Sequence, residues 1–303
     1  MKILVSVLDW GLGHATRTSA LVGRLVAEGN DVVLAGSGKS IAMLCNDYPQ
    51  LRCLKLKSFS PFFFRYLPQW VAITLQVPCF LLYIFKEWWQ VHKIIAKEKF
   101  DMIISDNRYG VRNKKSCSIL LTHQLSPIVA MWAPEFINTL FARCLSIFIN
   151  RFDEVWVPDI ADFPNGLAGR LADPRFVKIK VKTIGLLSRL EKRSDISASV
   201  INHLAIISGP EPQRTMFENE INQIFARSIG VKKVFNGVGY ISAEELSMSV
   251  QQAQQIYCRS GYSTIMDLVK MGKKAKLKPT KGQAEQEYLA ERMCQFGFSK
   301  LEN

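Results

Sequence analysis

Residues 2–29 read KILVSVLDWGLGHATRTSALVGRLVAEG, and this stretch decides the fold class. An apolar, β-branched run over 2–8 meets Gly11 and Gly13, and an amphipathic segment then continues to Gly29. A buried strand, a glycine turn and a helix in that order form the first part of a βα unit. Because such alternations recur along the chain, the sequence predicts an α/β fold with parallel sheets.

The alternation divides the chain into two halves. Strands are predicted near 2–8, 31–35, 51–56, 101–105, 117–122, 154–157 and 178–184, and again near 203–208, 232–235, 255–258 and 274–277. Between them, residues 188–202 begin with the polar, aperiodic SRLEKRSDISAS and are predicted to be a linker. Two Rossmann-like domains, 1–187 and 203–303, are therefore expected, each of ordinary size.

The charge of the chain predicts an anionic partner. At 303 residues and 48% hydrophobic content the chain can bury a substantial core, and its formal net charge of +13 attracts phosphates, anionic lipids and nucleic acid alike. Nucleic acid is not expected, because no zinc-finger spacing, RNA-binding aromatic signature or basic heptad region occurs. Phosphate-bearing substrates and a membrane surface are the remaining classes.

The cysteines and the amino terminus predict a cytoplasmic protein. Seven cysteines lack C-x-x-C pairs, which favours core thiols in a reducing compartment. The amino terminus enters a β-like run directly, without the charged, apolar and cleavable regions of a signal peptide.

One segment interrupts the βα pattern. Residues 61–89, PFFFRYLPQWVAITLQVPCFLLYIFKEWW, are strongly aromatic and carry only three charged side chains. Prolines at 68 and 78 argue against a membrane-spanning helix. A helix in the membrane interface is predicted, with basic residues of 61–99 near anionic headgroups. A long buried helical hairpin is the alternative.

The loop after the first strand is the first candidate site. Gly11 and Gly13 permit a tight turn at the start of a helix, whose free amides favour an anion. The positive end of the helix dipole favours neutral imidazole at His14, which suits a proton acceptor. A plain glycine turn with a capping histidine is the alternative. Polar residues after two later strands lie at the sheet edge of the same half and could form a binding pocket with this loop, namely Asp106, Asn107, Arg108 and His123. Buried polar groups satisfied by loop backbone are the alternative for these four residues.

The strand–helix junctions of the second half predict a nucleotide site. Arg214, in the first turn of a helix, opposes the helix dipole and asks for an anion such as a diphosphate. Asp267 lies one turn inside another helix, where a carboxylate can accept both hydroxyls of a ribose. The candidate residues of this nucleotide site, which the resemblance described next makes a sugar-donor site, are Gly209, Arg214, Arg259, Ser260, Gly261, Ser263, Thr264, Asp267, Gln283, Gln286 and Glu287. Ordinary capped helices are the alternative.

Residues 257–291 are similar to the C-terminal domain of glycosyltransferase family 28, whose best-known member adds N-acetylglucosamine to the lipid-linked peptidoglycan precursor. The glycine-histidine loop at 11–14 resembles the acceptor loop of that family. The resemblance implies a GT-B fold, with two Rossmann-like domains and a cleft between them. It also implies that a UDP-sugar binds the C-terminal domain and that a lipid-linked or other membrane-associated glycan acceptor binds the N-terminal domain.

The implied activity is transfer of a hexosyl or N-acetylhexosaminyl group in cell-envelope glycan synthesis, on the inner face of the membrane. His14 is the first choice as catalytic base and Asp9 the second. Glu287 replaces a glutamine that is more usual in the family, which leaves the donor sugar open. No Asp-x-Asp motif occurs, so neither a metal nor another cofactor is expected, and the leaving diphosphate would be held by a helix dipole and arginine.

Two departures from the family predict a shortened C-terminal domain. Residues 230–241 are shorter than the usual βαβ stretch, and the chain stops at Asn303, where the family continues through a further helix. Two other functions stay open on sequence grounds. One is a nucleotide-sugar 2-epimerase of the same fold, and the other is a non-catalytic subunit that binds a nucleotide sugar or lipid.

Overall fold

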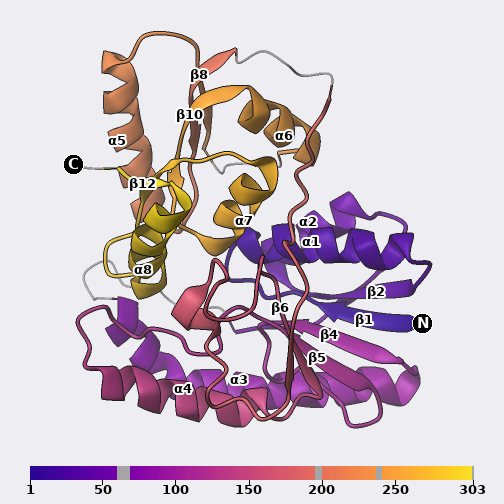
Figure 1. Cartoon of the computed structure of the whole chain (residues 1–303). Helices are drawn as coiled ribbons and strands as arrows, with labels where there is room; N and C mark the ends of the chain where they lie inside the picture. The colour runs from indigo at the N-terminus through magenta and orange to yellow at the C-terminus, as the bar shows by residue number, and fades with distance from the viewer. Residues whose placement is uncertain (60–68, 195–199, 237–240, 302–303) are drawn as a thin grey trace. The chain divides into compact units, whose positions relative to one another are not determined.

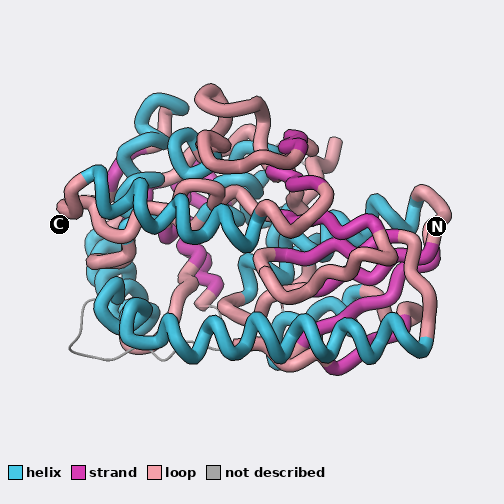
Figure 2. The backbone as a smooth tube through the Cα atoms, turned by 90° about the horizontal axis from the view of Figure 1, so that it is seen from below, coloured by secondary structure: helices cyan, strands magenta, loops and turns pink. Residues whose placement is uncertain are grey.

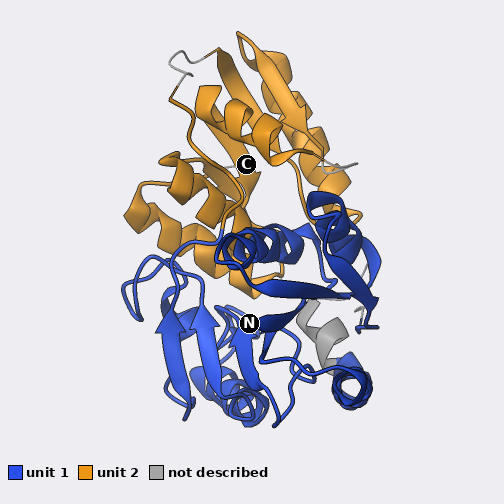
Figure 3. Ribbon diagram, turned by 90° about the vertical axis from the view of Figure 1, so that its right-hand side faces the viewer, with its two compact units in different colours: residues 1–187 blue, residues 188–303 orange. Residues whose placement is uncertain are grey.

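A computed structural model describes residues 1–59, 69–194, 200–236 and 241–301, without the side chains of 69–74 (Figure 1). The chain divides into two compact units, Met1–Leu187 and Ser188–Asn303, which Figure 3 colours separately. Each unit is built on its own parallel sheet.

The sheet of the first unit contains seven strands in the order β3-β2-β1-β4-β5-β6-β7. Every pair is parallel, as in the registers Val5↔Leu34 and Val5↔Ile104 on the two sides of β1. The order reverses between β1 and β4, which makes their carboxyl ends the switch point of this sheet. The seven predicted strands are confirmed as β1 Lys2–Ser6, β2 Asp31–Gly36, β3 Arg52–Lys55, β4 Met102–Asp106, β5 Cys117–Leu121, β6 Glu154–Val157 and β7 Lys180–Thr183.

Helices cover both faces of this sheet. Helices α1 (Leu12–Ala27) and α2 (Gly38–Asp47) lie on one face, and α3 (Gln69–Lys97) and α4 (Glu135–Ile149) lie on the other (Figure 1). The period of two along each strand supplies both cores. Ile3, Val5 and Val32 pack with Leu21, Val22 and Leu25 of α1, whereas Leu4, Val33 and Ile103 pack with Val91 and Ile95 of α3. A 3₁₀ turn, Gly169–Ala172, precedes β7.

The second unit has a five-stranded parallel sheet in the order β12-β11-β10-β8-β9. Its switch point lies between β8 and β10. The strands are β8 Ile201–Ile206, β9 Lys232–Phe235, β10 Ala253–Arg259, β11 Lys276–Lys278 and β12 Ser299–Lys300. The helices are α5 Gln213–Arg227, α6 Ala243–Gln252, α7 Tyr262–Met271 and α8 Ala284–Arg292, followed by a 3₁₀ turn, Met293–Phe296. The predicted strands of this half are confirmed.

Much of the predicted linker 188–202 belongs to the second unit. Leu190 is buried, the Arg189 guanidinium donates to the Ile241 carbonyl at 2.9 Å, and the Ser188 hydroxyl donates to Asp267. The last two residues of the range lie in β8, and residues 195–199 are outside the described part. The polar composition of 188–194 therefore reflects hydrogen bonds to the second unit rather than free chain.

The aromatic segment forms one helix from Gln69 onward, and its first residues, 61–68, lie outside the described part. Helix α3 continues through Pro78, so a hairpin is excluded for 69–97 (Figure 2). One side of α3 is buried on the sheet, but Phe85 is 64% and Trp89 52% exposed on the other. In α4, Phe136 is 70% exposed. No helix among the described residues has the length and apolar content needed to cross a membrane.

The prediction of core thiols is wrong for most cysteines. Cys45 of α2 and Cys53 of β3 form a disulfide, because neighbouring elements bring their Cα atoms to 6.7 Å. Of the five free cysteines, only Cys258 is buried.

Candidate functional site

The switch point of the first sheet gathers charged side chains from three segments. His14 and Arg17 stand one turn apart on α1 and therefore share a face of the helix. Asp106 ends β4, and His123 follows β5. The parallel strands bring these carboxyl ends to one edge, where α/β sheets bind ligands.

Asp106 is the centre of this cluster and is 1% exposed. Arg17 donates to Oδ1 through Nε at 3.0 Å and through a second nitrogen, and the Thr18 hydroxyl donates to Oδ2 at 2.9 Å. Burial by itself raises the pKa of Asp106, but the charges and hydrogen bonds of Arg17 and His14 outweigh it and hold the pKa well below its usual range. Asp106 is therefore an ionised carboxylate at neutral pH.

His14 is oriented by this carboxylate. Its Nδ1 lies 3.1 Å from Asp106 Oδ2 and 2.9 Å from a nitrogen of Arg17. A carboxylate accepts a proton from Nδ1 and a guanidinium donates one to it, so the two contacts favour opposite tautomers of the ring. The tautomer with its proton on Nδ1 is the one that pairs His14 with Asp106. In neutral imidazole this leaves the lone pair on Nε2. The side chain is 20% exposed, and a base held by a buried carboxylate in this way can accept a substrate proton.

The remaining acceptor candidates play different parts. His123 joins the cluster, with Nδ1 3.2 Å from Arg17. Asn107 has a positive φ of 53°, and its Oδ1 accepts hydrogen bonds from the hydroxyl groups of Tyr109 and Thr122, at 3.1 Å each. Both residues organise the edge of the sheet from partly or fully buried positions.

The prediction of Arg108 as an acceptor ligand is wrong. Its guanidinium is buried, pairs with Glu87 of α3 at 2.9 Å, and donates to the carbonyls of Lys57 at 2.8 Å and Val7 at 3.3 Å. Burial lowers the pKa of Arg108 and raises that of Glu87, and their attraction opposes both shifts. A buried polar group must be satisfied within the protein, and here the arginine connects α3 to the sheet.

Asp9, the second candidate for the base, contacts the start of α2. Its Oδ1 accepts the Ser40 backbone N–H at 3.1 Å, and its carboxylate lies against Gly38 at the start of α2. The carboxylate thereby satisfies a free amide of a helix N-terminus. Gly11 (φ 128°) is the N-cap of α1 and has open space around its missing Cβ, and Gly13 is exposed in the first turn. The loop backbone is thus open to a ligand where Asp9 is engaged.

An aromatic cluster that the sequence did not identify adjoins the same loop. Trp10, 38% exposed, donates through Nε1 to the Phe59 carbonyl at 2.6 Å, and its ring centroid lies 6.0 Å from that of Phe80. Phe59, Phe80, Tyr83 and Tyr109 continue the contacts. This aromatic cluster, some of whose rings also carry polar groups, therefore lies beside the loop that carries His14.

The switch point of the second sheet is built mainly from glycines. Gly209 follows β8 with a φ of 109°, and Gly261 is the N-cap of α7 after β10. No atom lies within 4 Å of a Cβ built on either residue. The backbone at this edge, together with the N-terminus of α7, can approach an anionic ligand closely.

Arg214 already has an anionic partner. Its guanidinium pairs with Glu211 and Glu218 and donates to the Asn236 carbonyl at 2.8 Å. The anion that an arginine at a helix start requires is therefore supplied by the chain itself. A diphosphate at this place would compete with Glu211.

Three other candidates for the donor site are buried and make hydrogen bonds to the backbone of neighbouring loops and helices. The Ser260 hydroxyl is fully buried and donates to the Gln286 carbonyl at 2.7 Å. The Gln286 side chain accepts the Thr280 N–H at 2.9 Å. Arg259 is buried over the ring of Phe217 and donates to the Gln213 carbonyl at 2.7 Å. The Ser260 hydroxyl joins the starts of α7 and α8, so the predicted contact of Ser260 with the nucleotide would have to come from its backbone.

The other donor candidates lie in the first turns of α7 and α8. Ser263 and Thr264 are partly exposed in α7, and Gln283 is the N-cap of α8. Glu287 accepts the Gly282 N–H at 2.7 Å. These positions flank the glycine-lined edge from two helices.

The Asp267 carboxylate accepts a hydrogen bond from the Ser188 hydroxyl. Burial raises the pKa of Asp267 to about 6, against the lowering effects of the Ser188 hydrogen bond, Arg189 and Lys270. A carboxylate of this kind gains from a further pair of donors such as ribose hydroxyls.

Arg17 and Thr18 are the residues of the first cluster that the sequence analysis did not select. Their signal was the spacing of three and four residues from His14, which places all three on one side of α1. Among the described residues, no group of three or more histidine, cysteine or acidic side chains is arranged to hold a metal ion.

Solved glycosyltransferase structures resemble the whole chain. The glycotransferase of kitacinnamycin matches with a TM-score of 0.65 and 15% identity, over 99% of this chain and 84% of that chain. The spinosyn rhamnosyltransferase SpnG complexed with thymidine diphosphate matches with 0.65 and 11%, over 99% and 86%. MurG of Acinetobacter baumannii matches with 0.59 and 14%, over 99% and 84%.

This similarity defines the fold as GT-B, with two Rossmann-like units, which confirms the predicted fold class. No family model matches the sequence, and no curated protein matches it. The identities are low, so the similarity concerns the fold alone.

Proposed function

We propose that this chain is a metal-independent glycosyltransferase, similar to family 28, that moves a hexosyl or N-acetylhexosaminyl group from a UDP-sugar to a lipid-linked or other membrane-associated acceptor. The observation that carries the proposal is the His14–Asp106 pair at the switch point of the first sheet, 3.1 Å between Nδ1 and Oδ2. A base oriented by a buried carboxylate is what activation of an acceptor hydroxyl requires.

In the proposed reaction, His14 Nε2 takes the proton of the acceptor hydroxyl as the oxygen forms a bond to the anomeric carbon. The bond from that carbon to the diphosphate oxygen breaks, and UDP leaves with the electron pair. Asp106 stabilises the imidazolium that forms, because it is already ionised and hydrogen-bonded to Nδ1. The first unit thus supplies the base and the acceptor site, including the exposed backbone at Gly11 and Gly13.

The second unit is proposed to hold the donor. Glycine-lined backbone and the N-terminus of α7 would face the diphosphate, and Asp267 would accept the ribose hydroxyls. Arg214 would exchange Glu211 for the diphosphate. Gln283 and Glu287, in the first turn of α8, would contact the sugar.

The proposed membrane contact rests on two helices of the first unit. Exposed apolar side chains of α3 and α4 lie on one side of the sheet, and basic residues such as Lys86, Lys93 and Lys97 accompany them on α3. An amphipathic surface of this kind fits an anionic bilayer interface. Peripheral attachment to the inner face of the membrane, in cell-envelope glycan synthesis, is the location that follows.

The alternatives make different demands on the same site. A nucleotide-sugar 2-epimerase would leave the exposed faces of α3 and α4 unused, and the similar structures named above are glycosyltransferases. A non-catalytic binding subunit would leave the His14–Asp106 pair without a task. The shortened C-terminal domain stays a prediction.

The test is an assay of transfer with the purified protein, a panel of UDP-sugars and polyprenyl-linked acceptors. Product mass identifies the sugar and the acceptor together. Formation of a glycosylated lipid supports the proposal, interconversion of the UDP-sugar alone supports an epimerase, and binding without consumption supports a non-catalytic subunit.

A further inference from the structure

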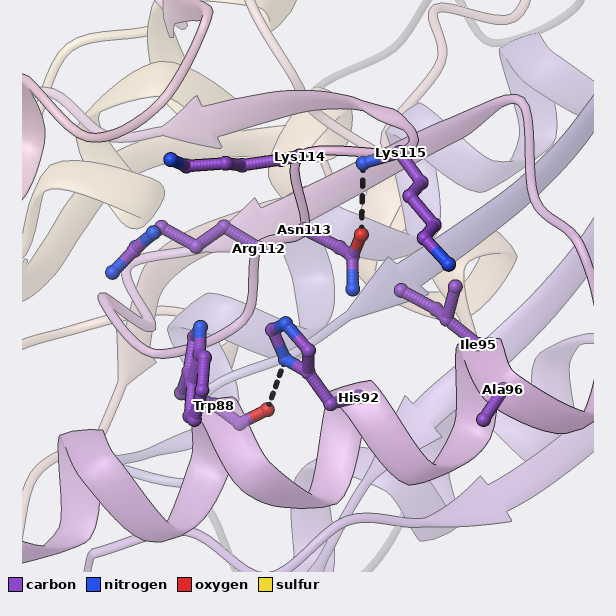
Figure 4. A pocket seen from close by; sticks show the side chains of 8 residues that line it. All are labelled: Trp88, His92, Ile95, Ala96, Arg112, Asn113, Lys114 and Lys115. Atoms are coloured by element: carbon purple, nitrogen blue, oxygen red, sulfur yellow. Dashed lines mark hydrogen bonds between the residues drawn. The ribbon is translucent and has the colours of Figure 1, made fainter.

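A basic pocket lies away from the switch point of the first sheet, between the carboxyl half of α3 and the loop that joins β4 to β5. Its volume is about 330 Å³, enough for a phosphate group and a short polyol. Figure 4 shows the Arg112 and Lys114 side chains extending in the same direction, above Trp88 and His92. The lining residues are Trp88, His92, Ile95, Ala96, Arg112, Asn113, Lys114 and Lys115.

The positive charge of this pocket has no counterpart in the part of the chain that the structure describes. No carboxylate there pairs with the side chains of Arg112, Lys114 or Lys115, and the lining contains no acidic residue. The Nε atom of Arg112 is buried without a hydrogen-bond partner. Burial and the nearby charge of Arg151 lower the pKa of Arg112. Arg112 therefore lies in a positively charged environment. Such an arrangement favours binding of an anion.

A ring nitrogen of His92 lines the aromatic side of the pocket. His92 Nδ1 lies 2.8 Å from the Trp88 carbonyl, which only accepts, so we place a proton on Nδ1. The other ring nitrogen points toward the loop that carries Arg112 and Asn113 (Figure 4). When the imidazole is doubly protonated, this nitrogen can donate to a phosphate oxygen.

The pocket adjoins the exposed apolar side of α3. The Trp88 ring stacks on Phe85, with centroids 5.8 Å apart and an angle of 27° between the planes, and Phe85 is 64% exposed. The next residue, Trp89, is exposed, and Lys93 Nζ lies 3.3 Å from the centroid of its ring. A ligand with a phosphate in the pocket can therefore continue into an apolar tail along Phe85.

We propose that this pocket binds the phosphate of an anionic membrane lipid, whose acyl chains lie against the exposed side of α3. This inference rests on the membrane contact of the proposed function and adds a defined headgroup site to it. A phosphate oxygen accepts from the side chains of Arg112, Lys114 and Lys115, whereas a zwitterionic headgroup would bring its ammonium beside these three cations.

The experiment compares two variants that each lose two positive charges. The pocket variant is R112Q/K114Q, and the control is K39Q/K55Q, which removes two exposed lysines of α2 and β3. Sedimentation with phosphatidylglycerol-containing vesicles and with pure phosphatidylcholine vesicles measures lipid binding. Calorimetry with inorganic phosphate and with glycerol phosphate measures the affinity of the pocket for soluble phosphates.

The pocket variant is expected to lose affinity for phosphatidylglycerol vesicles by about 10- to 100-fold, the loss typical of charge-assisted hydrogen bonds, whereas the control changes little. Phosphatidylcholine vesicles should bind weakly in all cases. Because Arg112 is partly buried, circular dichroism checks that the pocket variant folds. The variant K114Q/K115Q repeats the test at two exposed side chains, whose replacement should not disturb folding.

Equal losses in the pocket and control variants would overturn the proposal in favour of diffuse attraction. Tight binding of glycerol phosphate without any vesicle binding would assign the pocket to a soluble phosphate and overturn the lipid part. Turnover on a detergent-dissolved acceptor is measured in parallel, so absence of transfer activity, which contradicts the proposed function, remains distinct from loss of lipid binding.

Discussion

At the switch point of the first sheet, the chain concentrates charge: Asp106 is buried among Arg17, Thr18 and His14, and every oxygen of its carboxylate has a donor. At the switch point of the second sheet, glycine backbone lies open at Gly209 and Gly261. The polar side chains near these glycines mostly secure the loops. The same topological position thus carries a charged network in one unit and accessible backbone in the other.

The proposed function gives the two edges different tasks. A proton acceptor must be held in one orientation and one protonation state, which a buried ion pair with its histidine achieves. A diphosphate needs close approach of amides and a helix N-terminus, which a glycine provides. The two edges thus match the proposed placement of proton transfer at the first and nucleotide binding at the second.

The largest expected effect separates the two edges directly. Replacement His14→Asn should lower turnover by about 10²- to 10⁴-fold, because it removes the general base. Nucleotide affinity, measured by calorimetry with UDP, should stay unchanged. Unchanged turnover would remove His14 from the chemistry.

The next effect concerns stability beside the first edge. Replacement Arg108→Met should lower the free energy of unfolding by about 3–5 kcal/mol, because it leaves the Glu87 carboxylate buried without its partner. Denaturant unfolding measures the loss, and the double variant Arg108→Met with Glu87→Met should recover much of it. A large rise in acceptor KM with normal stability would instead restore Arg108 to the acceptor site.

The sequence predicted the fold well and the site unevenly. The strands were identified because β-branched runs end in glycine or polar residues, and His14, Asp106 and His123 were selected because they follow strands. A polar residue after a strand can serve a ligand or the loop itself, and Ser260, Arg108 and Asp9 proved to serve the loop or a neighbouring helix. Which of the two applies depends on partners distant in the chain, such as Glu87, that no local pattern reveals.

Arg17 illustrates the opposite case. A helix arginine surrounded by threonine and serine resembles a solvent-exposed residue, yet it is buried against Asp106. Its role depends on the reversal of strand order between β1 and β4, which sets Asp106 beside α1.

At the second edge, pH should distinguish a nucleotide-binding carboxylate from a structural one. The pKa of Asp267 is raised to about 6, and ribose hydroxyls donate to its ionised form. UDP affinity should therefore fall by about tenfold or more as pH decreases through 6, the effect of losing charge-assisted hydrogen bonds. Asp267→Asn should flatten this profile.

Folding stability should respond to the same group with the opposite sign. The folded chain binds the Asp267 proton more tightly than the unfolded chain, whose aspartate titrates near about 4. The contribution of this group to stability is therefore full below about pH 4 and is lost as pH rises through 6. Thermal melting of the parent and Asp267→Asn proteins across this range measures it, and parallel curves for both would contradict the assignment.

The smallest effect tests the open backbone. Gly261 has an ordinary φ and space for a Cβ, so Gly261→Ala should fold normally, with a change in stability within about 0.5 kcal/mol. Its methyl group would enter the open side and weaken UDP binding by roughly tenfold, about 1.4 kcal/mol, a typical steric cost in a close-packed site. Unaltered UDP affinity would place the nucleotide elsewhere.

The central claim is that the charged edge performs a sugar transfer for which the glycine-lined edge supplies the donor. It is tested most directly by the mass of the product formed from a UDP-sugar and a polyprenyl-linked acceptor, with the parent protein and the His14→Asn variant side by side. The account predicts that the parent protein makes an acceptor heavier by one hexose or N-acetylhexosamine residue. The variant should form at least about 10²-fold less of this product. An unmodified acceptor, or equal product from both proteins, would contradict it.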